Sequence, residues 1–367
     1  MTQSWKTTRR SPGVMRVLGC ACALVLITAT PGLAKPRPQA GAPAANWADN
    51  YLAQLARKGE FSGVVLVSRG GKPVFERAYG QAVAGWNIRN TPATRFEIAS
   101  LTKQFTGAAI LQLAEAGKLE LGDSVTRYYP QAPASWAGIT IRQLVTHTSG
   151  LPNNEIKDFT KGISVPYTPE ELIGTFRDRP LVAKPGAVWA YTNTEYYLLA
   201  YIIQKVSGQS YADYLSAHIF GPAGMTHSGF ASTLAIVPEA AEGYSRDGKA
   251  LRHRDYFDRS LEQGAGGIYS TVGDMALWNT ALDGGKLLNK ESLARMFAPS
   301  VPGDYGYGWF ITSKPRLREF HEGSDPGFAV FEARYPETGM LILVFSNLED
   351  APVRKIESDL AAKFVAP

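Results

Sequence analysis

Cysteine is almost absent from this chain of 367 residues. Its two cysteines, Cys20 and Cys22, both lie in the first 34 residues, which we expect to be removed from the mature protein. The remainder therefore has no disulfide, no thiol nucleophile and no thiolate metal ligand. The five histidines form no H-E-x-x-H motif and no close cluster with carboxylates. We expect neither a metal ion nor another cofactor.

The chain also has little excess charge. It contains 38 Lys and Arg against 33 Asp and Glu, and four of the basic residues but none of the acidic ones lie in residues 1–34. The remaining 34 basic and 33 acidic residues nearly cancel, which argues against nucleic-acid binding. We expect a small-molecule or peptide substrate, no nucleic-acid partner, and membrane contact only through the N-terminal segment; we assign no oligomeric state.

Residues 1–34 have the layout of a secretory signal peptide. A basic start precedes a mostly apolar run at 17–30, and small residues at 32–34 match a signal peptidase site. We predict cleavage after Ala34 and an exported protein, periplasmic or secreted, of a bacterial envelope. An uncleaved membrane anchor is one alternative, although the apolar run is short of the about 20 residues that a crossing needs. Lipid attachment at Cys20 is the other alternative.

The rest of the chain divides into a short leader and one large domain. Residues 35–46 are rich in Pro and Ala, which predicts a flexible leader. Residues 47–367 are expected to form the catalytic domain, starting with a helix at 47–58. Apolar runs at 61–67 and 73–79, separated by a glycine pair, predict a β-hairpin.

Strands are expected at both ends of this domain and helices in its middle. A helical pattern covers 99–115. Further expected elements are four short strands and a last helix, at 308–312, 319–323, 329–335, 340–346 and 352–364. We therefore predict an α+β (α/β) fold with one antiparallel sheet flanked by helices, built from 47–118 and 283–367. Residues 119–282 are expected to form an all-helical lobe, with the active-site cleft between the two lobes.

The first chemical motif is Ser100-Leu101-Thr102-Lys103. On a helix, residues three apart share a face, so Lys103 lies within reach of Ser100. A lysine held in a dry cleft can lose its proton near neutral pH and activate the serine hydroxyl. Free N–H groups at the helix start offer an oxyanion donor. Taken alone, the motif is better explained as a helix N-cap followed by a solvated lysine.

The second motif is Tyr191-Thr192-Asn193. A phenol beside an ammonium group can have its pKa lowered and can relay a proton, either to a leaving group or as a second base with Lys103. The Asn193 amide carries both a donor and an acceptor, which suits holding a substrate amide. The alternative is a polar turn before a helix expected at 195–205.

The third motif is His321-Glu322-Gly323-Ser324, placed at the end of an expected strand. Glycine allows close approach of the backbone to a ligand. The backbone N–H of Ser324 can then act as a second oxyanion donor, opposite that of Ser100. The alternative for His321 is a half-buried strand residue with one hydrogen-bonded ring nitrogen.

Read in order, S-x-x-K, Y-x-N and H-x-G resemble the three motifs of the serine β-lactamase and penicillin-binding protein superfamily. The Y-x-N form is similar to the class C β-lactamase branch, with its D,D-peptidase, D-aminopeptidase and esterase relatives. The stretches 146–152, 185–193 and 264–270 also fit this branch, and the resemblance covers roughly residues 47–350.

This resemblance implies a fold and a set of roles. The β-lactamase/transpeptidase-like fold joins an α/β sheet domain to an all-helical domain, in agreement with the order of elements above. Ser100 becomes acylated, Lys103 is the base, Tyr191 shuttles protons and Asn193 orients the substrate. The segment from His321 to Ser324 lines the other wall of the cleft.

The third motif departs from the K-T-G of class C β-lactamases. A Lys and a Thr suit a substrate carboxylate, whereas a Glu322 that points into the cleft would repel it. We therefore rank an ester or peptide-like amide first, a D,D-carboxypeptidase substrate second and a β-lactam third. A silent sensor that only binds penicillin or peptidoglycan is a further alternative, and the absence of G-x-S-x-G argues against an α/β-hydrolase. We expect His147 to be a packing residue.

Overall fold

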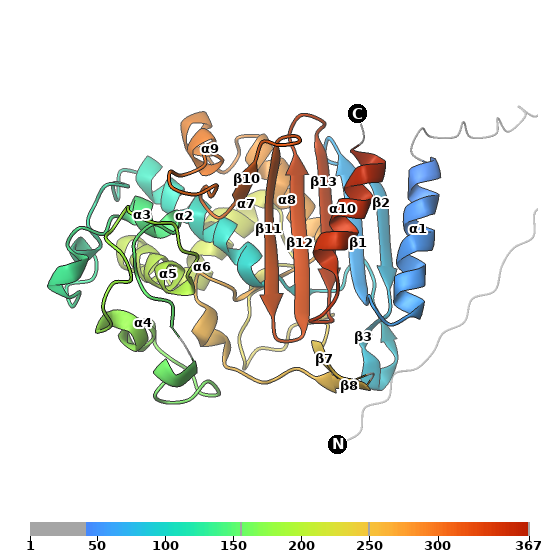
Figure 1. Cartoon of the computed structure of the whole chain (residues 1–367), viewed down its shortest axis with the longest axis horizontal. Coiled ribbons are helices and arrows are strands. Elements are labelled where there is room, and N and C mark those ends of the chain that lie inside the picture. Colours follow the sequence, from blue (N-terminus) through green and yellow to red (C-terminus); the bar gives the residue numbers. More distant parts are fainter. Residues whose placement is uncertain (1–41, 155, 249, 366–367) are drawn as a thin grey trace, which may run out of the picture. The chain divides into compact units, whose positions relative to one another are not determined.

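Six strands from the two ends of the chain form one antiparallel sheet in the computed structural model, which describes residues 42–154, 156–248 and 250–365. The strands lie in the order β10-β11-β12-β13-β1-β2 (Figure 1). Their bounds are β1 Gly63–Arg69, β2 Lys72–Tyr79, β10 Phe310–Thr312, β11 Arg318–Asp325, β12 Phe328–Tyr335 and β13 Met340–Ser346. The antiparallel sheet and the strands at both ends are confirmed.

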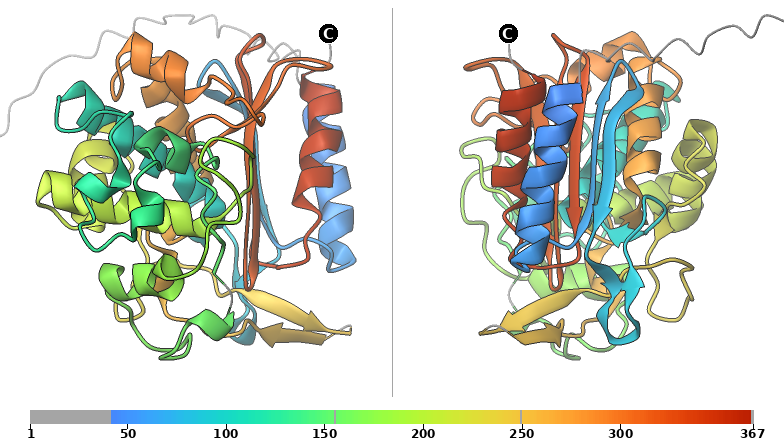
Figure 2. Two further views of the ribbon diagram at one scale, coloured as in Figure 1. Left: turned by 60° about the vertical axis from the view of Figure 1, so that its left-hand side comes forward. Right: turned by 90° about the vertical axis from the view of Figure 1, so that its right-hand side faces the viewer.

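Helices cover both faces of this sheet, which explains why its central strands are apolar on both sides. Every residue of β12 and β13 is buried. The first helix, α1 Ala42–Arg57, and the last, α10 Val353–Phe364, lie side by side on one face (Figure 2). The other face packs against α8 Val272–Asp283. The remaining helices lie on the same side of the sheet as α8 (Figure 2).

The predicted hairpin is present as β1 and β2. Gly70 and Gly71 form its turn with φ angles of 54° and 74°. Two consecutive positive φ angles are what a two-residue hairpin turn needs, and glycine adopts them at no steric cost. The turn places β2 next to β1, and β2 is an edge strand of the sheet.

The predicted leader at 35–46 is wrong for its last part, because α1 begins at Ala42. Pro43 is tolerated in a first helical turn, where its missing N–H has no partner to lose. Ala44 and Ala45 are strong helix formers, and both pack against the apolar cluster between α1 and the sheet. The leader's first part and the predicted signal segment, residues 1–41 together, lie outside the described residues.

The predicted helix at 99–115 has two parts. A single 3₁₀ turn, Ala99–Leu101, leads into α2 Thr102–Glu115. Eleven residues of α2 are buried, so α2 is a central helix packed on all sides rather than one with a single apolar face. Its main neighbour is α5 Asn193–Ser207, and the active site forms where the N-termini of these two helices meet.

The middle of the chain is not all helical, which corrects the prediction for 119–282. A hairpin of β7 and β8 accompanies the helices there, and β6 and β9 form a small sheet with β5 from an earlier part of the chain, in the order β5-β9-β6. The hairpin carries glycine at its turn, a sequence signal that the helical interpretation overlooked. The strands are β3 Gln81–Val83, β4 Ile88–Arg89, β5 Phe96–Glu97, β6 Gly229–Phe230, β7 Tyr244–Asp247, β8 Ala250–His253 and β9 Ile268–Ser270. The other helices are α3 Ile141–Val145, α4 Pro169–Arg177, α6 Tyr211–Leu215, α7 Gly221–Ala223 and α9 Lys290–Met296.

Within the described ranges, no helix combines the length and the apolar character that a membrane crossing requires.

Candidate active site

The first two motifs meet at the ammonium group of Lys103. Its Nζ lies 3.1 Å from Ser100 Oγ, the pairing that the spacing of three residues predicts. The same Nζ donates to Asn193 Oδ1 at 2.9 Å and to the backbone oxygen of Ala265 at 2.9 Å. Three segments that are far apart in the sequence are thus joined by one side chain.

Burial lowers the pKa of Lys103 from 10.5 to about 7, because the charged form loses its hydration, while Asp325, Glu262 and Glu195 partly oppose the shift. The Lys103 side chain is fully buried. Near neutral pH a large fraction of this lysine is therefore uncharged and able to accept a proton. This is the state that a general base for a serine hydroxyl requires.

The backbone just before Ser100 is held in an unusual conformation. Ala99 has a φ angle of 46°, in the left-handed region that non-glycine residues rarely adopt. Neighbouring backbone bonds fix it: Ile98 N donates to Ile268 O at 2.9 Å, and Leu101 N donates to Ile98 O at 3.0 Å. Strain of this kind persists where the surroundings determine the geometry, and here it orients Ser100.

Tyr191 lies beside both Ser100 and Lys103. Lys103 Nζ is 4.9 Å from the centre of the Tyr191 ring. Burial raises the pKa of Tyr191, and a hydrogen bond with Ser100 opposes this only in part. The predicted lowering of this pKa by the neighbouring ammonium is therefore wrong. Tyr191 keeps its proton in the free protein. It can therefore donate or relay a proton during the reaction, but it is not a deprotonated general base before the reaction starts.

Asn193 is the first residue of α5, and Thr192 caps that helix. The backbone N–H of Asn193 donates to Asn153 Oδ1 at 3.1 Å, which anchors the start of the helix. Since its Oδ1 accepts from Lys103, the Nδ2 donor is the group that can reach a substrate carbonyl.

His321 is buried and bonded at both ring nitrogens. Its Nδ1–H donates to the Glu322 backbone oxygen at 2.7 Å, so Nε2 is the acceptor for the Tyr305 hydroxyl at 2.9 Å. Burial, together with the charge of Lys103, lowers the pKa of His321 to about 3. The third motif therefore presents an uncharged imidazole near Tyr191, whose ring centre lies 6.1 Å away.

Glu322 is not part of the site, and its assignment as a substrate-binding residue is wrong. Side chains alternate along a strand, so Glu322 points to the opposite face of β11 from its neighbours His321 and Gly323. There its Oε1 lies 2.6 Å from Arg354 Nη2 on α10, with both side chains largely exposed. The argument that Glu322 repels a substrate anion therefore fails.

Gly323 and Ser324 contribute through their backbone. Gly323 packs against Ile98 and Ala99, directly behind Ser100. The Ser324 side chain is exposed. Strand β10 pairs with β11 only from Arg318 to Phe320, so β10 does not cover the edge of β11 at Ser324.

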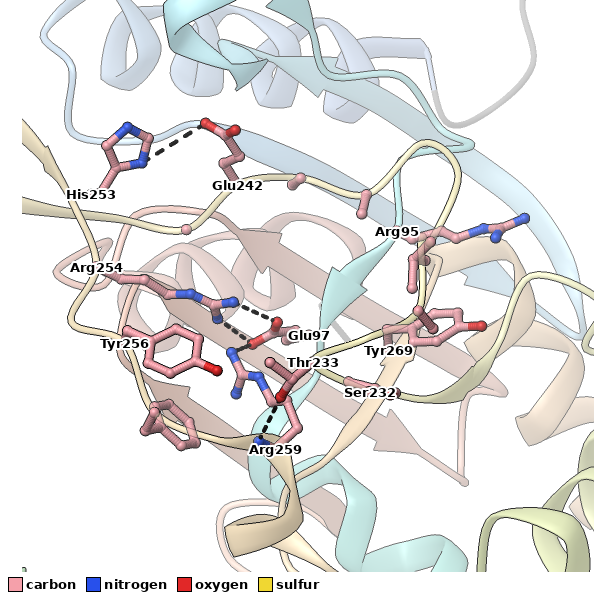
Figure 3. Close-up of a pocket in the computed structure, with 17 residues that line it drawn as sticks. Arg95, Glu97, Ser232, Thr233, Glu242, His253, Arg254, Tyr256, Arg259 and Tyr269 are labelled. Atoms are coloured by element: carbon pink, nitrogen blue, oxygen red, sulfur yellow. Dashed lines mark hydrogen bonds and ion pairs between the residues drawn. The ribbon is translucent and has the colours of Figure 1, made fainter. Parts of the chain in front are cut away.

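A cavity of about 360 Å³ lies next to the site but contains none of the eight predicted residues (Figure 3). At its centre Glu97 forms ion pairs with Arg254 and Arg259. Arg259 also binds Glu262 at 2.8 Å. This buried network fixes the turn that presents the Ala265 oxygen to Lys103.

Sequence reasoning missed several groups of the site. The 264–270 stretch shows only a family resemblance, and nothing in its residue types indicates that the Ala265 carbonyl oxygen accepts a hydrogen bond from Lys103. Tyr305 belongs to no motif. Glu195, two residues after Asn193, is fully buried against His147. Among the described residues, no three His, Cys, Asp or Glu side chains are grouped so that they could hold a metal ion.

A family model described as Beta-lactamase matches residues 48–366 of the chain. The protein belongs to the beta-lactamase family. Membership and the relatives below also make it a serine hydrolase with a β-lactamase/transpeptidase-like fold.

Relatives of this beta-lactamase-family protein include PbpX of Bacillus subtilis (strain 168), 36% identical over 301 residues, which is 82% of this chain and 73% of PbpX. The fold of this chain is similar to that of a penicillin-binding protein from Bacillus halodurans. The TM-score is 0.77 and the identity 29%, over 85% of this chain and 100% of that one. A D-amino acid amidase from Ochrobactrum anthropi SV3 has a TM-score of 0.77 and 25% identity, over 88% of this chain and 98% of that one.

Proposed function

We propose that the protein hydrolyses an ester or a peptide-like amide through an acyl-enzyme formed on Ser100. The observation that carries the proposal is the buried Lys103, whose Nζ lies 3.1 Å from Ser100 Oγ and whose pKa is lowered by burial to about 7. A lysine in this state and position can take the serine proton at neutral pH.

In the first half of the reaction, Lys103 accepts the Ser100 proton and Oγ attacks the substrate carbonyl carbon. The backbone N–H groups of Ser100 and Ser324 stabilise the resulting oxyanion. Tyr191 passes a proton to the leaving nitrogen or oxygen, its own oxygen is reprotonated from Lys103, and the bond to the leaving group breaks. Asn193 donates to a carbonyl of the substrate and holds it in register.

In the second half, water attacks the acyl-enzyme ester. Lys103, now neutral again, accepts a proton from this water through Tyr191 or directly. The tetrahedral intermediate collapses, Ser100 Oγ leaves with a proton, and the carboxylic acid is released. The same groups thus act twice in opposite directions.

The substrate is proposed to lack a carboxylate beside the scissile bond. The third motif offers an uncharged His321 in place of a lysine, because burial lowers the pKa of His321 to about 3 and both its nitrogens are already bonded. The similarity of the fold to a D-amino acid amidase supports an amide as the substrate. With Glu322 outside the site, this preference rests on His321.

A penicillin-binding D,D-carboxypeptidase is the second candidate. It is favoured by the similarity to the penicillin-binding protein from Bacillus halodurans. Hydrolysis of β-lactams is the third, and a silent binding protein would need a site that cannot deprotonate Ser100. We also propose that the protein is exported; sequencing the N-terminus of the mature protein from its natural host should begin at Lys35.

The first test is intact-mass spectrometry of the wild-type protein and of a Ser100→Ala variant. A fluorophosphonate should add to the wild type and not to the variant. Incubation with a penicillin then separates the candidates: a stable adduct or loss of the drug favours the second or third. Labelling by the fluorophosphonate without any penicillin reaction, together with turnover of D-amino acid amides or esters, supports the first. Full activity of Ser100→Ala contradicts the whole mechanism.

A further inference from the structure

His147 and Glu195 form a fully buried pair that the proposed mechanism does not use. His147 Nδ1 lies 2.5 Å from Glu195 Oε2, and neither side chain is more than 1% exposed. Burial raises the pKa of Glu195 well above its ordinary value and lowers that of His147 well below. The pair is therefore an uncharged acid and an uncharged imidazole.

The surrounding donors show where the protons lie. Glu195 Oε1 accepts from the Ser149 hydroxyl at 2.5 Å and from the Ser149 backbone N–H at 3.1 Å. The Thr192 backbone N–H points at His147 Nδ1 from 3.4 Å, so Nδ1 acts as an acceptor. Glu195 then donates its Oε2 proton to Nδ1, and the imidazole carries its own proton on Nε2.

That Nε2–H has no partner among the described residues. An unpaired buried donor costs about 1–3 kcal/mol, and an apolar side chain would fill the same space without this cost. A buried donor without a hydrogen-bond partner is thus better explained by a functional role of His147 than by packing alone.

The neighbours of the His147 imidazole indicate which functional role this residue has. Its ring centre is 4.4 Å from that of Tyr191 and 4.7 Å from that of Tyr305. The backbone is also clamped, since Ala190 N, directly before Tyr191, donates to His147 O at 2.9 Å. With the Thr192 contact, His147 holds the chain on both sides of Tyr191.

We propose that His147, oriented by Glu195, is a positioning residue for proton transfer by Tyr191. This inference rests on the proposed function. The pair fixes the Tyr191 ring against Lys103 and places an N–H donor beside it, which lowers the energy of the tyrosinate that forms while the proton passes to the leaving group. The pair touches neither the substrate nor Ser100; it acts through Tyr191.

The test uses two substrates with one acyl group and different leaving groups. An activated aryl ester expels a stable phenolate and needs little protonation, whereas an amide needs a proton on its nitrogen. The ratio of kcat/KM for the amide to kcat/KM for the aryl ester is measured in one preparation, so any misfolded fraction cancels. Tyr191→Phe sets the scale, and we expect it to lower this ratio about 100-fold, the size of a general-acid effect.

Four further variants separate the roles. His147→Asn tolerates the positive φ of 59° at this position and removes the ring donor; it should lower the ratio about 10-fold. Glu195→Met removes the hydrogen bond from Glu195 that orients the His147 ring, and it should also lower the ratio about 10-fold. Glu195→Gln keeps a donor toward Nδ1 and an acceptor toward Ser149, so the ratio should stay within about 3-fold of the wild type. Glu332→Gln, at a buried glutamate bonded to Gln104 and Asn279, is the matched control and should leave the ratio unchanged.

An equal loss on both substrates in His147→Asn and Glu195→Met, or no loss, overturns the inference. A ratio in Glu195→Gln as low as in Glu195→Met overturns the assigned protonation and the inference with it. If the wild type hydrolyses neither substrate, the proposed function itself fails. If the wild type hydrolyses both substrates, the proposed function stands and the variants test the further inference alone.

Discussion

A Cβ atom on Gly323 would lie 2.6 Å from the carbonyl oxygen of Ile98, two residues before Ser100. It would also lie 2.6 Å from Val330 Cγ2 and 3.0 Å from Ala99 Cβ. Strand β11 can approach the nucleophile's turn this closely only with glycine at this position. The third motif therefore sets the position of the first by packing.

Gly323→Ala should slow acylation of Ser100 at least 10-fold. The added methyl group must push Ile98 and Ala99 away, and overpacking of this kind costs about 1–3 kcal/mol of stability. The rate of fluorophosphonate labelling and the thermal midpoint measure both effects. A variant that labels at the wild-type rate would show that the turn at Ala99 does not depend on β11.

The activity should rise with pH through about 7 and then level off. Only the uncharged form of Lys103 can accept the Ser100 proton, and its pKa is about 7. Lowering the pH protonates this lysine, so the rate falls on the acid side. The measurement is kcat/KM for an ester between pH 5 and pH 9. Lys103→Arg, which stays charged throughout, should lose at least 100-fold at every pH; a pH-independent wild type would contradict the assignment.

Glu322→Gln should leave kcat/KM within about 2-fold of the wild type on neutral and anionic substrates alike. The side chain points to α10 and pairs with Arg354 at a site where both partners are largely exposed. Exposed ion pairs of this type contribute about 0–1 kcal/mol. Arg354→Ala serves as the matched change and should have the same small effect on chemical denaturation. A shift of substrate preference in Glu322→Gln alone would place this carboxylate back in the cleft.

Tyr305→Phe should destabilise the protein by about 1–3 kcal/mol, because His321 Nε2 then becomes a buried acceptor without a donor. The substitution should also lower kcat/KM more than a core substitution far from the site would. The reason is that Tyr305 packs against Tyr191, with 6.3 Å between the two ring centres. Denaturant unfolding and kcat/KM test the two parts separately. Unchanged stability would mean that the imidazole finds another donor.

The sequence sufficed for the sheet and for the chemistry that depends on short spacings. Apolar runs identify β1, β12 and β13, whose residues are almost all buried. The glycine turn after β1 identifies β2, which is mostly exposed or half-buried. The three-residue spacing of Ser100 and Lys103 likewise fixes their contact. The turn of the hairpin and the contact of Ser100 with Lys103 both depend on residues a few positions apart in the sequence.

What depends on contacts between distant segments could not be predicted. Whether Glu322 faces the cleft follows from the register of β11 and from Arg354 on α10, neither of which a motif encodes. The rise in the pKa of Tyr191 follows from burial, which outweighs the opposing effect of its hydrogen bond with Ser100. The unpaired Nε2 of His147 depends on a partner 48 residues away.

The pairing of β1 with β13 has a consequence for how the chain matures. Ser346 Oγ donates to Ser62 O across 284 residues of sequence, so the central strands of the sheet meet only when almost the whole polypeptide is available. The segment with Ser100 and Lys103 is synthesised early, yet its supporting strand β11 arrives near the end. Shortened chains and translation intermediates therefore carry the nucleophile without the strand that supports it, and we expect hydrolytic activity only in the finished protein.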